Sequence, residues 1–387
     1  MRFPVVGGKI DEPKALKQLR HAIDSGVNYI DTAYFYHGGQ SEAFIGRALK
    51  DGYREKVNIA TKMPPWLVHD TKDFEVIFSE QLRRLQVDTI DYYLLHALNR
   101  ENWEKFLSLG ILEYLTKLKQ EGRVRNLGFS FHGDRQIFKE IIDAFSWDFC
   151  QIQYNILDEY NQAGVEGLKY AYSKEIAVFV MEPLRGGTLV NKLPDQVLDI
   201  YKSVEPTWTP AEWSLKWIWN HPEVTMLLSG MTEDAHIESN LEYAKQMSPG
   251  TMSQSDVEAV AQVKEIYMSL QRVPCTSCQY CLPCPFGVDI PRCFDLYNSK
   301  YLLGQKVGTF YWMQLGGFNG KPSYASLCKR CGKCLEHCPQ TIMIPDRLDE
   351  VAKDMENKWM RPAIKLAAGA IKHYTTTKRR FRGVKNK

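Results

Sequence analysis

The sequence has little cysteine outside one stretch and no long apolar segment. Of its ten cysteines, nine lie between residues 275 and 338 and only Cys150 lies elsewhere. No run of about 18 apolar residues occurs, so no membrane span is expected. The first residues, MRFPVVGGKIDEPK, contain no apolar core and include the charged Lys9, unlike a signal peptide. Together these absences predict a cytoplasmic protein.

An excess of one charge is also absent from most of the chain. The net charge is +3, but six basic residues and no acidic one occupy the last twelve positions. They are Lys378, Arg379, Arg380, Arg382, Lys385 and Lys387. Without them acidic residues outnumber basic ones, so no nucleic-acid partner is expected. The basic end reads as a solvated tail, with contact to a partner protein or an anionic surface as the alternative.

The first 230 residues alternate between short apolar runs and helical patterns. The runs lie at residues 27–31, 57–61, 90–95, 124–130, 149–153, 176–181 and 224–229. Helical spacing of apolar residues occurs between them, for example at 12–24 and 71–86. This alternation predicts a parallel sheet covered by helices. Seven strands favour a TIM (β/α)8 barrel over an open doubly wound sheet, since no GxGxxG turn is present.

Polar residues follow three successive predicted strands. Asp31 ends the first strand, Lys62 follows the second and His96 follows the third, while Tyr36 lies in the loop after Asp31. Barrel enzymes place their active sites at these strand ends. An ammonium near a phenol lowers the phenol's pKa, a carboxylate keeps the ammonium charged, and an imidazole orients a carbonyl oxygen. Such a set predicts reduction of a carbonyl group.

The segment GVNYIDTAYFYHGGQSEAFIGRAL, residues 26–49, resembles the signature of the aldo/keto reductases. The resemblance covers about residues 1–250 and implies a TIM barrel with a nicotinamide cofactor at its mouth. It also implies a catalytic tetrad of Asp31, Tyr36, Lys62 and His96, with Tyr36 as general acid.

The resemblance also implies the residues that contact the cofactor. Ser130 and Gln151 match residues that hold the nicotinamide, and PLRGGTL, residues 183–189, is similar to the pyrophosphate loop. The contacts implied there and in the adenosine segment are Leu184, Arg185, Gly186, Gly230 and Asn240. Phe131 stands where the family usually has asparagine, and Met181 and Glu182 stand where an aromatic ring usually stacks. Either NADP or NAD suits this pattern.

The first strand of the barrel is missing from the pattern. Relatives have a glycine-containing strand before the residues that match MRFPVV, and this chain begins where that strand would end. Either the chain starts further upstream than the sequence given, or the barrel lacks its first strand. A barrel without that strand would expose strand edges.

The cysteine-rich stretch contains two motifs, CTSCQYCLPCP at 275–285 and CKRCGKCLEHCP at 328–339. Three cysteines at C-x2-C-x2-C spacing and a further C-P are typical of [4Fe–4S] ligation. Zinc sites usually contain two separated C-x2-C pairs, and disulfides are not expected without an export signal. Cys150 and Cys293 are expected to be buried thiols.

The two motifs resemble those of ferredoxin-like modules with two [4Fe–4S] clusters, in which each fourth cysteine serves the other cluster. That resemblance implies Cys275, Cys278, Cys281 and Cys338 for one cluster and Cys328, Cys331, Cys334 and Cys284 for the other. We therefore expect a barrel at 1–250, a linking helix at 251–274, a small α-helical two-cluster domain at 275–350, and a basic C-terminal helix and tail at 351–387.

Two functions follow from the sequence. The first is an NAD(P)H-dependent reductase of a small carbonyl substrate, whose clusters are structural or take electrons from a separate redox partner protein. The second is an iron–sulfur electron carrier that uses the barrel as a docking scaffold. No flavin motif links the hydride chemistry of a nicotinamide to the single-electron chemistry of a cluster. An iron–sulfur sensor has little support.

Overall fold

The chain divides into two compact units. The computed structural model describes residues 2–187, 189–191, 193–275, 277, 279, 281–302, 308–316, 322–338 and 340–356. The first unit is Met1–Val260 and the second begins at Ala261, so the boundary falls inside helix α11 (Gln254–Ser269). The predicted limits of the four segments stay predictions. Cys278 and the basic tail lie outside the described residues.

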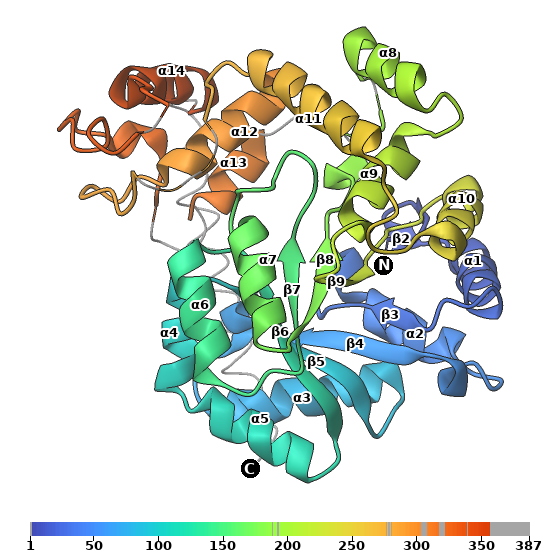
Figure 1. The fold of residues 1–387 in the computed structure, drawn as a ribbon. Helices are drawn as coiled ribbons and strands as arrows, with labels where there is room; N and C mark the ends of the chain where they lie inside the picture. The colour runs from blue at the N-terminus through green and yellow to red at the C-terminus, as the bar shows by residue number, and fades with distance from the viewer. Residues whose placement is uncertain are drawn as a thin grey trace. The chain divides into compact units, whose positions relative to one another are not determined.

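Seven parallel strands form the sheet of the first unit, paired in the order in which they occur along the chain (Figure 1). They are β3 (Tyr29–Asp31), β4 (Asn58–Met63), β5 (Ile90–Leu98), β6 (Val124–Phe131), β7 (Phe149–Gln153), β8 (Ala177–Met181) and β9 (Val224–Leu227). All seven predicted strands are confirmed. Because every neighbouring pair is parallel, the carboxyl ends of all seven strands lie at the same end of the sheet.

Helices alternate with the strands along the chain, and most of them lie along the outside of the sheet (Figure 1). They are α1 (Glu12–Asp24), α2 (Ser41–Ala48), α3 (Lys72–Leu85), α4 (Arg100–Ser108), α5 (Ile111–Gln120), α6 (Arg135–Ala144), α7 (Gly164–Ser173), α8 (Asp195–Val204), α9 (Pro210–Trp219) and α10 (Asp234–Gln246). Asp11 accepts a hydrogen bond from the Lys14 amide and so caps α1, with Pro13 in the first turn. Asp134 caps α6 through the Ile137 amide.

The sheet curls so that side chains from distant strands pack together on its inner face. Tyr29 of β3 meets Phe179 of β8 with ring centroids 5.3 Å apart, although four strands separate them in the pairing order. Phe179 also packs against Phe149 of β7, at 4.9 Å, and Tyr92 of β5 lies 5.1 Å from Tyr29. A flat sheet could not bring these rings together, so the seven strands form most of a barrel.

The sheet ends at β3 on one side and at β9 on the other. Within the part of the chain that the structure describes, no strand pairs with the outer edge of either. The two valines that end the MRFPVV segment belong instead to a small antiparallel hairpin, β1 (Val5–Val6) with β2 (Lys9–Ile10).

Helices α1 and α10 lie beside each other next to these two end strands, joined by polar contacts (Figure 1). Gln18 of α1 donates hydrogen bonds to the Thr232 carbonyl and to Asp234. His21 of α1 contacts Glu238 of α10 at 2.6 Å. These contacts hold the β9 end of the sheet close to its β3 end.

The second unit is small and helical. Its helices are the end of α11, α12 (Ile290–Leu302), α13 (Gly308–Gln314) and α14 (Ile344–Met355). Phe294 and Tyr297 of α12, Trp312 of α13 and Leu348 of α14 belong to one buried cluster. Six of the seven described motif cysteines pack against this cluster, namely Cys275, Cys281, Cys284, Cys328, Cys334 and Cys338. The core therefore lies directly behind the cysteine loops.

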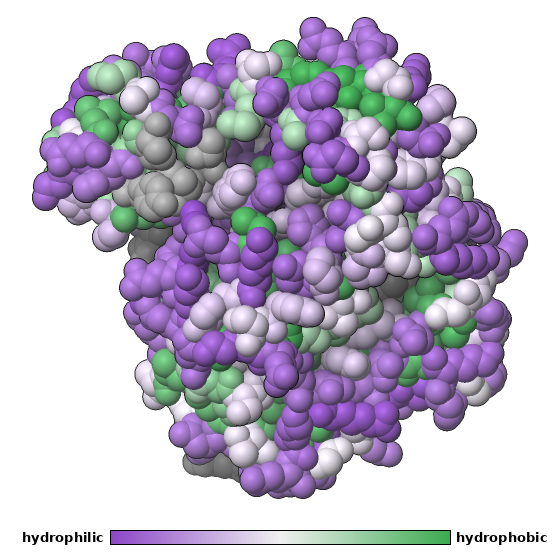
Figure 2. Space-filling view, viewed as in Figure 1, coloured by the Kyte–Doolittle hydropathy of each residue, from purple (hydrophilic) through white to green (hydrophobic). Residues whose placement is uncertain are grey.

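Hydrophilic residues cover most of the face shown in Figure 2, and apolar residues appear there in separate patches. None of the described helices combines the length and the apolar character needed to cross a bilayer.

The contact between α2 and α3 supplies a test of the packing. A Cβ atom on Gly46 of α2 would lie 2.5 Å from the Arg84 carbonyl oxygen and 2.7 Å from Leu85 backbone atoms. Alanine is otherwise the better helix former. We expect Gly46→Ala to lower the free energy of unfolding by about 2 kcal/mol, as overpacking does, in a urea titration.

The matched control is Gly308→Ala in α13, where an added Cβ has no atom within 4 Å. There the same substitution should leave stability unchanged or raise it. A Gly46→Ala protein as stable as the wild type would show that α2 and α3 are not packed this closely.

Candidate functional site

Lys62 lies near the carboxyl end of β4 and is fully buried. Its ammonium Nζ donates hydrogen bonds to the Asp31 carboxylate Oδ2 at 2.7 Å and to the Thr32 carbonyl at 2.8 Å. The parallel pairing of β3 with β4, in which Asp31 faces Ala60, brings the carboxylate to the lysine. A charge this deeply buried needs such a partner.

Tyr36 and His96 complete the group. Tyr36 begins the short helix η1 (Tyr36–Gly39), and the Lys62 ammonium lies 5.0 Å from the centroid of its ring. The rings of Tyr36 and His96 meet edge to face with centroids 6.3 Å apart. The structure therefore brings together all four residues of the predicted tetrad, from three neighbouring strand ends.

The pKa values of Lys62 and Tyr36 reflect this crowding. Burial lowers the pKa of Lys62, but the charges of Asp31 and Tyr36 outweigh it and the pKa lies above its usual value. Lys62 lowers the pKa of Tyr36, as the sequence argument expected. However, burial and the carboxylates of Asp31 and Glu182 raise that pKa by more, so it lies above its usual value. Tyr36 therefore keeps its proton at neutral pH.

His96 is neutral in this environment. Burial, with smaller contributions from the charges of Lys62 and His132, lowers its pKa well below the usual value. Its Nδ1 atom is buried without a hydrogen-bond partner among the described residues. The next residue, Ala97, has a φ of 51° and donates its amide to the Ser130 hydroxyl at 2.8 Å. Ser130 thus holds the strand end that carries His96.

Two exposed aromatic residues near His96 were not found from the sequence. Trp66 lies 5.1 Å from the His96 ring and 5.8 Å from Phe35, measured between ring centroids. Trp66 and Phe35 are 42% and 45% exposed, which is unusual for rings of this size. Their position in the loops directly after β4 and β3 was the available signal. They form an apolar wall beside the tetrad.

Gln151 of β7 is buried, and its amide oxygen has no partner among the described residues. Its amide nitrogen donates a hydrogen bond to the sulfur of Met181, at 3.5 Å. Buried polar atoms are normally paired. The amide oxygen of Gln151 and the Nδ1 atom of His96 are thus candidates for hydrogen bonds to a polar ligand.

The loops after β8 and β9 contain the other predicted cofactor residues. Arg185 points its guanidinium at Asp158, 3.5 Å away, and its backbone has a φ of 48°. Leu184 and Gly186 flank it in the same turn, where the φ of Gly186 is 66°. Three non-glycine residues near these strand ends, Glu182, Arg185 and Met231, have left-handed backbones. Such conformations concentrate at functional sites.

Gly230 and Asn240 lie at the β9 end of the sheet. The Asn240 amide donates to the Ser229 hydroxyl at 2.9 Å. A Cβ on Gly230 would come within 3.2 Å of the Arg2 side chain, which also pairs with Glu182 at 3.2 Å. The chain end therefore reaches the predicted cofactor region through a residue that the sequence did not single out.

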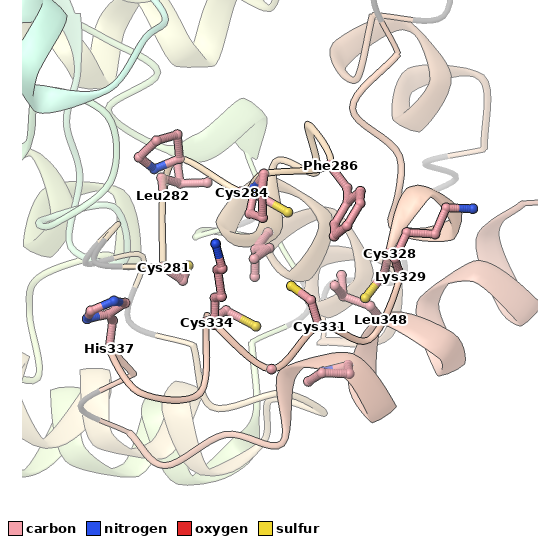
Figure 3. A pocket seen from close by; sticks show the side chains of 16 residues that line it. Cys281, Leu282, Cys284, Phe286, Cys328, Lys329, Cys331, Cys334, His337 and Leu348 are labelled. Atoms are coloured by element: carbon pink, nitrogen blue, oxygen red, sulfur yellow. The ribbon is translucent and has the colours of Figure 1, made fainter.

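The motif cysteines of the second unit line two cavities. The larger one, about 310 Å³, is bordered by Cys284, Cys328, Cys331 and Cys334, with Cys281 at its edge (Figure 3). Cys275, Cys281 and Cys338 border a smaller one. The fourth cysteine of each motif thus borders the cavity of the other motif, which is the arrangement that crossed ligation requires. Cys150 and Cys293 are buried, as expected, and line neither cavity.

The backbone around these cysteines also points toward sulfur. The Ser277 amide donates to the Cys275 thiol and the Arg330 amide to the Cys328 thiol, each at 3.4 Å. Ser277 and Arg330 both have positive φ, at 55°. Hydrogen bonds to sulfur are one way in which proteins tune iron–sulfur clusters. Among the described residues, no three His, Cys, Asp or Glu side chains lie close enough to hold a single metal ion.

The comparison with known families covers both units. Residues 1–265 match the Aldo/keto reductase family, and residues 274–343 match a 4Fe-4S dicluster domain. The chain belongs to the aldo/keto reductase family. It is an oxidoreductase of that type followed by a ferredoxin-like 4Fe-4S domain, as the sequence motifs predicted.

Two curated relatives illustrate the match to this aldo/keto reductase. The NADH-specific methylglyoxal reductase of Escherichia coli is 26% identical over 285 residues, covering 62% of this chain and 85% of the relative. L-galactose dehydrogenase of Arabidopsis thaliana is 26% identical over 297 residues, covering 66% of this chain and 86% of the relative.

Solved structures share the barrel. The holo form of an aldo-keto reductase from Bacillus halodurans superposes with a TM-score of 0.56 at 24% identity, covering 65% of this chain and 88% of that one. An aldo/keto reductase from Klebsiella pneumoniae, solved with NADP and acetate, gives 0.55 at 21% identity, covering 68% and 90%. These likenesses support the fold of the first unit.

The burial of His96 supplies a test of the site. Because its pKa is lowered, its imidazole should remain neutral as the pH falls through about 6.5, the usual value for histidine. NMR of ring-labelled histidine, with His96→Gln to assign the signal, should show no titration there. The unfolded chain takes up that proton, so the folded state should lose stability below about pH 6.5 compared with His96→Gln. A signal that titrates near pH 6.5 would contradict this.

Proposed function

We propose that this chain reduces an aldehyde or ketone to the alcohol with NADH or NADPH, with Tyr36 as the general acid. The observation that carries the proposal is the Lys62 ammonium, which Asp31 holds at 2.7 Å beside the Tyr36 ring. That ring in turn meets the ring of His96. These are groups that can deliver a proton to an oxygen while negative charge develops on it.

Each side chain has a separate part in the reaction. Tyr36, protonated at neutral pH, donates its proton to the carbonyl oxygen, and Lys62 stabilises the phenolate that remains. Asp31 fixes Lys62 and balances its charge. His96, neutral, orients the carbonyl oxygen by a hydrogen bond. A bound nicotinamide supplies the hydride that the carbonyl carbon accepts.

The residues near the tetrad fit a nicotinamide cofactor. The orphaned oxygen of Gln151 can accept a hydrogen bond from a carboxamide, and Arg185, in the turn that contains Gly186, offers a positive charge to a pyrophosphate. The sequence departs from the family pattern at Phe131, whose ring packs on Phe138 at 4.9 Å instead of providing an amide. Both NADH and NADPH remain in the proposal.

The substrate is a small molecule with an apolar portion. Phe35 and Trp66 offer exposed aromatic surface next to His96, and such rings bind apolar groups well. The methylglyoxal reductase among the relatives acts on a small carbonyl compound, which is consistent with this size.

The proposal includes two [4Fe–4S] clusters in the second unit. Cys275, Cys278, Cys281 and Cys338 would ligate one, and Cys328, Cys331, Cys334 and Cys284 the other. The two cysteine-lined cavities support these sets, although Cys278 lies outside the described residues. The clusters are structural or accept single electrons from a separate redox partner. Reduced thiols of this kind suit the cytoplasm.

The alternative is an iron–sulfur electron carrier without carbonyl chemistry. It is favoured by the altered nicotinamide contacts, because Met181 and Glu182 stand where the family usually stacks an aromatic ring on the nicotinamide. It is also favoured by the absence, among the described residues, of a strand paired with the outer edge of β3. Titration with NADH and NADPH under anaerobic conditions separates the two functions, because tight binding of either supports the reductase.

The general acid is tested by Tyr36→Phe. Removing the hydroxyl removes the proton donor while leaving the ring in place, so the rate of NAD(P)H oxidation with an aldehyde should fall by at least about a hundredfold. Steady-state assays with a panel of small aldehydes and ketones measure this.

The matched control is Tyr53→Phe, which removes an exposed hydroxyl bonded to Asp24. Its rate should equal that of the wild type. Equal rates for wild type and Tyr36→Phe would rule out Tyr36 as general acid.

Crossed ligation is tested by Cys284→Ala. Because Cys284 borders the cavity of the second motif, its loss should remove the cluster of Cys328, Cys331 and Cys334 and leave the other. The iron and sulfide content of anaerobically purified protein should fall to about half. Electron paramagnetic resonance of the reduced protein should show the signal of the remaining cluster.

Cys293→Ala is the control, because Cys293 is buried and borders neither cavity. It should retain full iron content. If Cys284→Ala lost the cluster of the first motif instead, ligation would follow each motif separately and the crossed assignment would be wrong.

A further inference from the structure

Behind the catalytic lysine, the interface between β4 and its covering helices is polar where it would ordinarily be apolar. Glu42 of α2, Gln81 of α3 and Thr61 of β4 are each 0% exposed. Ala60 belongs to the barrel interior, so the alternation along a strand turns Thr61 outward to the helices. Elsewhere α3 meets the sheet with apolar residues such as Phe78 and Leu85.

These three side chains form one hydrogen-bonded cluster that ends on the backbone of Lys62. Thr61 donates its hydroxyl to the Glu42 carboxylate at 2.6 Å, and the Gln81 amide donates to the same carboxylate oxygen at 2.9 Å. The Gln81 amide also donates to the Lys62 carbonyl at 3.0 Å. The side-chain carbonyl oxygen of Gln81 accepts a hydrogen bond from the Tyr93 hydroxyl of β5 at 2.7 Å.

A second contact from the same helix reaches the other side of the lysine. The hydroxyls of Ser41 and Thr32 lie 2.8 Å apart, and both residues are fully buried. The Thr32 carbonyl is one of the two acceptors of the Lys62 ammonium. The first turn of α2 therefore contacts both sides of Lys62. Glu42 holds Thr61, which precedes Lys62, and Ser41 holds Thr32, whose carbonyl accepts from the Lys62 ammonium.

Stability alone does not account for this cluster. The Glu42 charge is compensated by Arg84 at 3.2 Å, but a buried ion pair usually contributes no more to stability than apolar side chains of the same size. A fully satisfied polar network does fix geometry, because each of its bonds has a direction. Its place directly behind Lys62 indicates what it fixes.

We propose that Ser41, Glu42 and Gln81 are positioning residues, which hold Lys62 at the distance from Tyr36 that proton transfer requires. This inference rests on the proposed reductase function. None of the three touches the substrate, so each acts through Lys62.

The effect on Tyr36 can be read from the pH dependence of the reaction. The charged groups that act on Tyr36 are Lys62, Asp31 and Glu182, and the ring of His96 lies against it. Of these charges only Lys62 lowers the pKa of Tyr36. If Lys62 shifts away, the pKa of Tyr36 rises. The fall in reaction rate at high pH, which is the alkaline limb of the pH profile, should then occur at a higher pH than in the wild type.

The first test is Gln81→Met, which keeps the volume and removes the hydrogen bonds that Gln81 donates to Glu42, to Thr61 and to the Lys62 carbonyl. We expect the single-turnover rate at saturating NAD(P)H to fall about tenfold, the dissociation constant of NAD(P)H to stay unchanged, and the alkaline limb of the rate to move up by about half a pH unit. If Gln81→Met fails to fold, Glu42→Gln gives the same readout.

Asp91→Asn is the matched control for Glu42→Gln. Both carboxylates are 0% exposed, both pair with an arginine, and both accept a hydrogen bond from β4. Asp91 accepts from the Ile59 amide at 2.8 Å, at the amino end of the strand. Asp91→Asn should therefore lower thermal stability without moving the alkaline limb.

The outcomes separate the positioning role from the proposed function. If the wild type is active and both Gln81→Met and Glu42→Gln have the same alkaline limb as the wild type, the positioning role is wrong. So would an equal shift of the limb in Asp91→Asn. A wild type that reduces no carbonyl compound with either cofactor would overturn the proposed function, and the positioning role with it.

Discussion

The first unit depends on one buried ion pair. Lys62 is fully buried with its ammonium 2.7 Å from the Asp31 carboxylate, and a charge in that position without its partner would cost several kcal/mol. The pair joins the carboxyl ends of β3 and β4, because Asp31 and Lys62 must reach the same point. It also places a positive charge beside a phenol, which is the electrostatic condition for proton donation to a carbonyl.

Two opposing influences act on that phenol. Lys62 favours the phenolate, whereas burial and the carboxylates of Asp31 and Glu182 favour the protonated form and prevail. An acid that keeps its proton at neutral pH and has a cation beside the developing anion is well suited to its task, because the lysine's contribution grows as the proton leaves. The excess of negative charge near Tyr36 is thus compatible with catalysis.

The repeating parts of the fold could be predicted from the sequence, and its irregular parts could not. All seven strands and the meeting of Asp31, Tyr36, Lys62 and His96 followed from apolar runs and from residues at strand ends. The hairpin β1–β2 was missed because strands of two residues are too short to show a periodicity, and the helices α4, α8 and α10 were not among the patterns found in the sequence. The cluster of Glu42 and Gln81 was missed because a polar residue in a helix usually faces solvent, and only the fold shows that these two face β4.

The second unit shows why two motifs with a long connection form one domain. A segment this small has limited apolar surface to bury, and its core of Phe294, Tyr297, Trp312 and Leu348 lies against the cysteine loops. Because Cys284 borders the cavity of the second motif, neither of the two proposed ligand sets would be complete until both motifs come together. The proposed clusters would then join the ends of the domain as disulfides do in small secreted proteins. Folding of the helices between the motifs and assembly of the clusters would form one process.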